Sequence, residues 1–167
     1  MGTFSNLPLL GELYLSDNSI SSIDADAFLG LDNLSYIVLN NNLLTSIPSA
    51  VRGLPNLQML SLENNHITSL NADSFVGLSN VFSLKLQGND ISAVSDDTFK
   101  DIQTFWQPGA GARLCLGLNP LNCCGLEWLR DLEALDFLCD LRATCSGPVH
   151  LKGVALKDTS GVIACDA

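Results

Sequence analysis

Residues 34–44 read Leu-Ser-Tyr-Ile-Val-Leu-Asn-Asn-Asn-Leu-Leu, an L-x-x-L-x-L pattern followed by the asparagine Asn42 and by an apolar residue two positions later. The same pattern recurs on both sides of this stretch. Its asparagines lie 24, 23 and 24 residues apart, at Asn18, Asn42, Asn65 and Asn89. A pattern repeated at a nearly fixed interval predicts stacked copies of one small unit, each too short to bury its apolar face alone.

Each copy should contain one short strand, because its last two apolar residues, such as Ile37 and Leu39, are two apart and therefore lie on one face. These residues should fill the interior, and strands of successive copies should pair in parallel about 4.8 Å apart. A buried asparagine amide is costly unless it is hydrogen-bonded, so we expect it to bond the backbone of the turn after each strand. The expected fold is an α/β solenoid, a horseshoe with a parallel concave sheet and short helical or 3-10 turns on the convex side.

The convex side carries a second periodic feature, an aspartate two residues before a phenylalanine. The pairs are Asp26 and Phe28, Asp73 and Phe75, and Asp97 and Phe99, and Val51 replaces the ring in the 23-residue repeat. We expect the aspartates to cap short helical turns and the rings to stack along the outer wall.

The C-terminal part breaks the period. Asn119 lies 30 residues after Asn89, and the extra residues near Trp106–Gly111 predict an inserted loop, with Trp106 as a candidate ligand contact or simply a ring packed on the end of the array. All six cysteines fall between Cys115 and Cys165, which indicates a disulfide-stapled cap made in an oxidising compartment. We therefore expect repeats with about five strands over residues 1–118, and a cap with a helix from Leu126 to Phe137 over residues 119–167.

Charge limits the classes of partner. The net charge is −10, which argues against binding nucleic acid through its phosphates and against an anionic membrane surface. No stretch approaches the roughly 20 apolar residues of a membrane span. The chain shows no signal peptide, so we expect the signal peptide and any anchor to lie outside it. It also shows no polar cap before its first repeat, so either an N-terminal cap lies outside it or the first turn is left partly open.

The repeats together with the motif series Asn119-Pro120, Cys123, Leu126-x-Trp128-Leu129, Cys145-x-x-Pro148, Leu151-x-Gly153 and Cys165 resemble leucine-rich-repeat ectodomains with a cysteine-rich C-terminal cap. This group includes variable lymphocyte receptors, Toll-like receptors and Slit-type proteins, and the short array looks most like the first. The resemblance implies the disulfides Cys123–Cys145 and Cys124–Cys165. Cys115 and Cys139, which the family pattern lacks, would then pair or stay free.

In such a fold, a ligand would meet the side chains that lie between the core leucines and point out of the concave sheet. The candidate contacts are Glu12, Tyr14, Asp17, Tyr36, Asn40, Met59, Glu63, Lys85 and Gln87, and Ser61, Ser83, Cys115 and Gly117 are expected to be exposed on the same face. Tyr14, Tyr36 and Met59 should lie side by side, and tyrosine is a common contact residue of paratopes. Glu12, Asp17 and Glu63 make this face acidic, which favours a cationic or hydroxyl-rich ligand; alternatively they are ordinary solvated residues.

The predicted function is extracellular, immune-receptor-like recognition of an antigen or microbial surface polymer, a protein or glycan ligand. The alternative is the ectodomain of an adhesion or signalling receptor, Toll-like or Slit-like, that binds a protein. Neither histidine, His66 or His150, belongs to a catalytic motif, so we expect no enzyme activity, no cofactor and no metal. Asn33-Leu34-Ser35 is a candidate glycosylation site.

Overall fold

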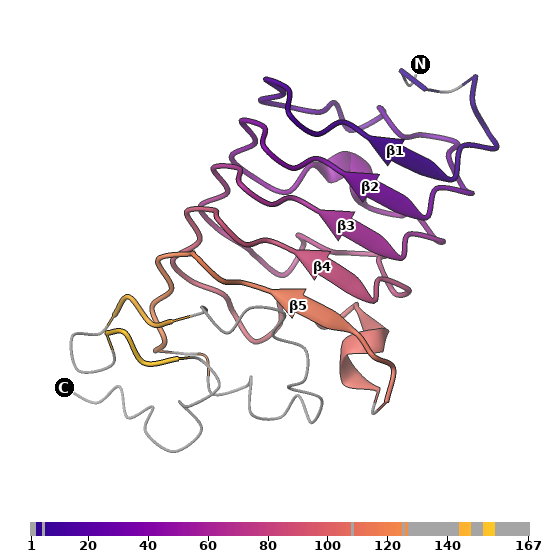
Figure 1. The fold of residues 1–167 in the computed structure, drawn as a ribbon. Helices are drawn as coiled ribbons and strands as arrows, with labels where there is room; N and C mark the ends of the chain where they lie inside the picture. The colour runs from indigo at the N-terminus through magenta and orange to yellow at the C-terminus, as the bar shows by residue number, and fades with distance from the viewer. Residues whose placement is uncertain are drawn as a thin grey trace.

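Five short strands form one parallel sheet whose order follows the chain (Figure 1). The structure is a computed structural model that describes residues 3–4, 6–107, 109–124, 126, 144–147 and 152–155. The strands are β1 (Glu12–Tyr14), β2 (Tyr36–Val38), β3 (Met59–Ser61), β4 (Ser83–Lys85) and β5 (Arg113–Cys115). One strand per repeat and parallel pairing between successive repeats confirm the predicted solenoid.

The register aligns the core residues of the strands. Leu13 pairs with Ile37, Ile37 with Leu60, Leu60 with Leu84, and Leu84 with Leu114. The last four of these five are at most 1% exposed, whereas Leu13 in the first strand is 8% exposed. The apolar residue at the centre of each strand therefore forms a continuous core under the sheet.

Phenylalanines close the core on the side away from the sheet. The rings of Phe75 and Phe99 are stacked at 5.5 Å, and the ring of Phe105 continues the row at 5.8 Å from Phe99. Phe28 stacks instead on Phe4 at 6.1 Å, and the buried Val51 occupies the intervening repeat. The prediction of stacked rings is thus confirmed on either side of the short repeat.

A spine of buried asparagines connects neighbouring coils. Asn89 donates from Nδ2 to the carbonyl oxygen of Leu86 in its own coil and to that of Leu62 in the preceding coil, both at 2.9 Å. Its Oδ1 accepts the backbone N–H of Ile67 at 3.0 Å. Asn42, Asn65 and Asn119 repeat this arrangement, which confirms the predicted role of the asparagines.

The convex side has hydrogen-bonded turns and two 3-10 helices, η1 (Ser49–Val51) and η2 (Gln103–Trp106). The prediction that aspartates cap these turns was wrong. Asn71 begins its turn instead, because its Oδ1 accepts the backbone N–H of Asp73 at 3.0 Å. Among the described residues, the carboxylates of Asp26 and Asp73 accept no hydrogen bond, so they are free to face solvent.

The described part of the C-terminal region is held by the disulfide Cys123–Cys145, whose Cα atoms are 5.4 Å apart. The backbone N–H of Cys123 also donates to the carbonyl oxygen of Gly147 at 2.9 Å. Cys115 and Cys124 are disulfide-bonded as well. The cysteines expected to pair with them, Cys139 and Cys165, lie outside the described residues, as does the predicted helix after Leu126.

Candidate ligand-binding surface

We call the side of the sheet that points away from the core the sheet face. Exposure on this face is uneven: Glu12 and Tyr14 on the first strand and Arg113 on the last are exposed, and the long side chains between them are half-buried. Tyr14 is 64% exposed and Glu12 is exposed, whereas Tyr36 and Met59 are half-buried. The exposed aromatic side chain of this face therefore lies on β1.

The expectation that Ser61, Ser83, Cys115 and Gly117 are exposed was wrong. Ser61 is 1%, Ser83 3% and Cys115 1% exposed, and Gly117 is also buried. Strands lie about 4.8 Å apart, so a short side chain is shielded by longer ones beside it. Ser83, for example, lies in register between Met59 and Arg113.

The three large side chains of this face do not form one row as predicted. Tyr36 is the register partner of Met59, but it pairs on its other side with Glu12. Tyr14 pairs with Val38 and therefore lies two residues further along its strand. The reason is that Tyr14 follows the core residue Leu13, whereas Tyr36 precedes Ile37. The face thus presents a diagonal tyrosine pair.

Tyr14 and Glu12 form a hydrogen-bonded unit on the first strand. The phenol oxygen of Tyr14 donates to Glu12 Oε2 at 2.8 Å. This hydrogen bond to Glu12, followed by desolvation and by the negative charge of Glu12, raises the pKa of Tyr14 above its ordinary value. Tyr14 therefore remains a neutral donor, with a carboxylate beside it, throughout the physiological range.

A ladder of polar side chains continues this surface at the turns after the strands. Asn41 donates from Nδ2 to Asp17 Oδ1 at 2.7 Å, and Asn64 donates from Nδ2 to Asn41 Oδ1 at 2.9 Å. All three residues have left-handed backbone conformations, with φ of 57° at Asp17, 55° at Asn41 and 53° at Asn64. Asn and Asp tolerate this conformation better than most side chains, which explains their presence here.

Two further candidate contacts are engaged with their neighbours. Glu63 accepts a hydrogen bond from Ser61 Oγ at 3.2 Å and forms an ion pair with Lys85 at 3.4 Å. Lys85 offsets the charge of Glu63, so the acidic groups of the predicted patch that form no ion pair are Glu12 and Asp17, each of which accepts a hydrogen bond from a neutral side chain. The side chain of Asn40 accepts the backbone N–H of Glu63 at 3.1 Å and helps to hold this turn.

Gln87 and Trp106 have different surroundings. Gln87 is half-buried, and its Oε1 is buried without a hydrogen-bond partner in the described part of the chain. Trp106 is 41% exposed, but its indole Nε1 donates to the carbonyl oxygen of Phe99 at 3.1 Å. That bond holds the indole against the Phe99 turn of its own coil, on the convex side, so Trp106 does not join the residues of the sheet face.

Asn33, the candidate glycosylation site, is exposed near the first coil. Its Nδ2 donates to the carbonyl oxygen of Pro8 at 2.9 Å. Its modification stays a prediction.

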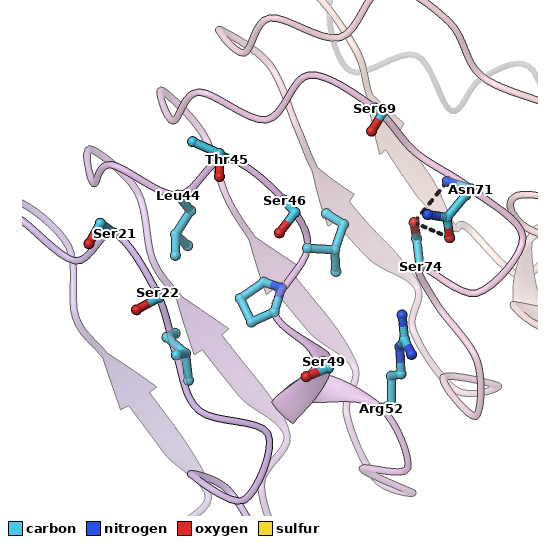
Figure 2. Close-up of a pocket in the computed structure, with 13 residues that line it drawn as sticks. Ser21, Ser22, Leu44, Thr45, Ser46, Ser49, Arg52, Ser69, Asn71 and Ser74 are labelled. Carbon is cyan, nitrogen blue, oxygen red and sulfur yellow. Dashed lines mark hydrogen bonds between the residues drawn. The ribbon is translucent and has the colours of Figure 1, made fainter.

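A second feature, which was not predicted from the sequence, is a groove of about 450 Å³ on the side of the coils away from the sheet face. Figure 2 shows its side chains in front of the strands. We call it the hydroxyl groove, because six serines and one threonine line it, with Asn71, Arg52 and an apolar floor; the serines and threonine are Ser21, Ser22, Thr45, Ser46, Ser49, Ser69 and Ser74. The available signal was a serine four residues after the asparagine of three successive repeats, at positions 22, 46 and 69.

Catalytic and metal-binding arrangements are not apparent in the described part of the chain. His66 Nδ1 lies 3.4 Å from Asp90 Oδ2, but both side chains are 59% exposed and form an ordinary surface pair. Within the described ranges no group of three or more His, Cys, Asp or Glu side chains is arranged to hold a metal ion. The helices of those same ranges also include none that is long and apolar enough to cross a membrane.

Comparison with known proteins places this architecture in a family. The family model described as "Leucine rich repeat" matches residues 1–44, 37–91 and 55–104. Among solved structures, the chain is similar to one described as "Crystal structure of TLR13-ssRNA13 complex", with a TM-score of 0.60 and 30% identity over 75% of this chain. The match spans 17% of that longer chain. No match was found among curated proteins. Since the family matches run together over residues 1–104, more than half of the 167 residues, the chain belongs to the leucine-rich-repeat family.

Proposed function

We propose that the protein is a non-enzymatic extracellular recognition protein of the variable-lymphocyte-receptor type, which binds an antigen or a microbial surface ligand on its sheet face. The observation that carries the proposal is the exposed unit of Tyr14 and Glu12 on β1, continued by Tyr36 on β2 and by Asp17 at the following turn. A rigid sheet that presents tyrosines and unpaired carboxylates suits a protein or glycan that offers cations or hydroxyl groups.

The rigidity of the scaffold supports this role. The first three coils, which carry the two tyrosines, are tied together by the backbone ladder, by the spine asparagines Asn42 and Asn65, and by the polar ladder of Asp17, Asn41 and Asn64. A binding surface whose backbone is fixed in this way loses little conformational entropy when a ligand binds. Met59, Asn40, Glu63, Lys85 and Gln87 would line the far part of the same surface.

Charge supports a ligand other than nucleic acid for this segment. The related structure is a complex with ssRNA13, but the match spans only 17% of that chain. Here the sheet face carries Glu12, Asp17 and Glu63 against Lys85 and Arg113, and a nucleic-acid site needs an excess of basic groups. We therefore expect single-stranded RNA to bind this chain no more tightly than it binds an acidic control protein.

Disulfides support an extracellular location, since they persist in oxidising compartments. Cys115, Cys123, Cys124 and Cys145 are all disulfide-bonded. The similarity to a Toll-like receptor structure favours one second candidate, a signalling receptor ectodomain that binds a protein partner. The two functions differ in their ligand and share the sheet face as the contact surface.

A binding screen against intact microbes, a glycan array and candidate proteins tests the proposal. The test variant is Glu12→Gln with Asp17→Asn, because both amides retain the oxygen that accepts the observed hydrogen bonds. The control variant is Asp26→Asn with Asp73→Asn, which removes the same charge from exposed positions on the convex side. Glu63 is left intact because Lys85 already offsets its charge.

Exposed charge pairs are worth roughly 0.2–1 kcal/mol each, so the test variant should weaken binding about 2- to 30-fold. The control variant should bind like the wild type, and added salt should narrow the difference. Equal weakening by both variants would show that net charge acts without a site. Unchanged binding by the test variant would show that the ligand does not bind at the sheet face.

A further inference from the structure

The hydroxyl groove has a composition that is unusual for this acidic chain. Its 13 lining residues include no Asp or Glu, although the chain as a whole has a net charge of −10. Its single charged residue is Arg52, the only Lys or Arg among the first 84 residues. The groove is therefore a local site of positive charge on a negative molecule.

The guanidinium of Arg52 is available for a ligand. In the described part of the chain Arg52 forms no ion pair, and Arg52 is exposed to solvent. Figure 2 shows its side chain extending toward Ser74 and Asn71 along one end of the groove. A planar guanidinium with free donors matches the two oxygens of a carboxylate or the oxygens of a sulfate.

The rest of the lining suits the other parts of a sugar. Successive coils place Ser22, Ser46 and Ser69 four residues after the asparagines of their repeats, so the hydroxyl groups recur with the spacing of the coils. Each alternates with a residue that turns inward, and two of these, Ile23 and Ile47, contribute to the lining with Pro48. Hydroxyl groups can both donate to and accept from sugar hydroxyls, while the apolar floor can contact the C–H face of a ring.

Much of the lining comes from the short repeat. Residues 44–49 and Arg52 belong to the 23-residue repeat, in which the buried Val51 stands in place of a phenylalanine. The coils on either side carry Phe28 and Phe75. The volume of about 450 Å³ falls within the ~300–1,000 Å³ of small-ligand sites.

We propose that the hydroxyl groove is a second binding site, separate from the sheet face, for a short acidic saccharide whose anionic group pairs with Arg52. A nucleic acid fits less well, because the lining contains one basic residue and no aromatic ring for base stacking. A free inorganic anion would leave the serine hydroxyls without partners.

The test uses two sugars that differ only at C6, methyl α-glucuronide with a carboxylate and the neutral methyl α-glucoside. Each is titrated into the disulfide-intact full chain while backbone amide signals are followed by NMR. The glucuronide should shift the amides of the groove residues in a saturable way and should bind more tightly than the glucoside.

Three variants complete the experiment. Arg52→Gln should weaken glucuronide binding by about tenfold or more, since charge-assisted hydrogen bonds carry the contact. Arg52→Lys should weaken it less, because it keeps the charge and loses the planar fork. Lys100→Gln, which removes an exposed cation outside the groove, should have no effect.

The proposal fails if the glucuronide gives no saturable shifts in the groove, if both sugars bind equally, or if Arg52→Gln binds like the wild type. The Glu12→Gln and Asp17→Asn variant of the sheet face should bind the glucuronide normally. A loss of binding in that variant would place the saccharide on the sheet face and would overturn the second site.

Discussion

Replacement of Asn89 by alanine tests the asparagine spine on which the stacking of the coils depends. The side chain is 4% exposed, and its Oδ1 is the hydrogen-bond acceptor for the backbone N–H of Ile67. Removal of that acceptor leaves a buried donor unpaired, which costs about 1–3 kcal/mol.

The two bonds that Asn89 donates add a smaller term. The carbonyl oxygen of Leu62 also accepts from Asn65, and that of Leu86 also accepts from Asn119. Each carbonyl therefore keeps one partner in the variant, and each lost bond should cost about 0.5–1 kcal/mol. We expect Asn89→Ala to lower the free energy of unfolding by about 2–5 kcal/mol in total.

Urea unfolding followed by circular dichroism measures this change, with Asn18→Ala as the matched control. Asn18 is exposed and donates only to Leu15 and Ser16 of its own coil, so water can replace these bonds and the loss should stay below about 1 kcal/mol. An Asn89→Ala protein as stable as the Asn18→Ala protein would refute the reasoning that the spine holds the coils together.

Three further predictions concern other parts of the molecule. Leu118 is 60% exposed and has a φ of 56°, a backbone conformation that strains a leucine but not a glycine. Leu118→Gly should therefore raise the free energy of unfolding by about 1 kcal/mol in the same urea experiment. A free energy of unfolding below that of the wild type would show that contacts of the Leu118 side chain outweigh the backbone strain. Removal of the Cys123–Cys145 disulfide, which joins residues 22 positions apart, should cost about 2–4 kcal/mol, and a thermal unfolding curve unchanged in the double alanine variant would contradict this. Glu12→Gln should lower the pKa of Tyr14 toward its ordinary value, because the amide keeps an acceptor oxygen but removes the negative charge that strengthens the hydrogen bond and disfavours the phenolate. Ultraviolet titration in a Tyr36→Phe background measures the pKa, and an unmoved pKa would mean that the charge of Glu12 is not the cause.

The fold could be predicted directly from the sequence because it depends on the regular spacing of leucines and asparagines along the chain. Residues such as Ile37, Leu60 and Leu84 occupy one register position, and the asparagine that follows each strand can be satisfied only if the coils stack. Neither property depends on the identity of the surrounding side chains, so spacing alone was sufficient.

The details of the sheet face were harder to predict because they depend on neighbours from other coils. Ser61 and Ser83 alternate correctly with core residues, yet longer side chains beside them remove them from solvent. The pairing of Glu63 with Lys85 brings together residues of adjacent repeats. Alternation along one strand specifies which face of the sheet a side chain points to. Its exposure and its unpaired charge depend instead on the lengths and charges of the side chains beside it on neighbouring strands.

The hydroxyl groove illustrates a different reason. Serines are common on solvent-exposed surfaces, so Ser22, Ser46 and Ser69 attract no notice individually. Their significance depends on the groove that residues from three successive coils line together and on the placement of Arg52 at its end. Such a groove is a property of three coils together and has no signature in any one of them.

Hydroxyl-radical footprinting of the protein with and without a captured ligand tests the central claim most directly. Tyr14, Tyr36 and Met59 carry readily oxidised side chains on the sheet face, and Trp106, at 41% exposed, provides an internal reference away from it. The proposed function predicts that the ligand protects Tyr14 and Tyr36 from oxidation and leaves Trp106 unchanged. Protection of Trp106 with unchanged oxidation of both tyrosines would contradict it.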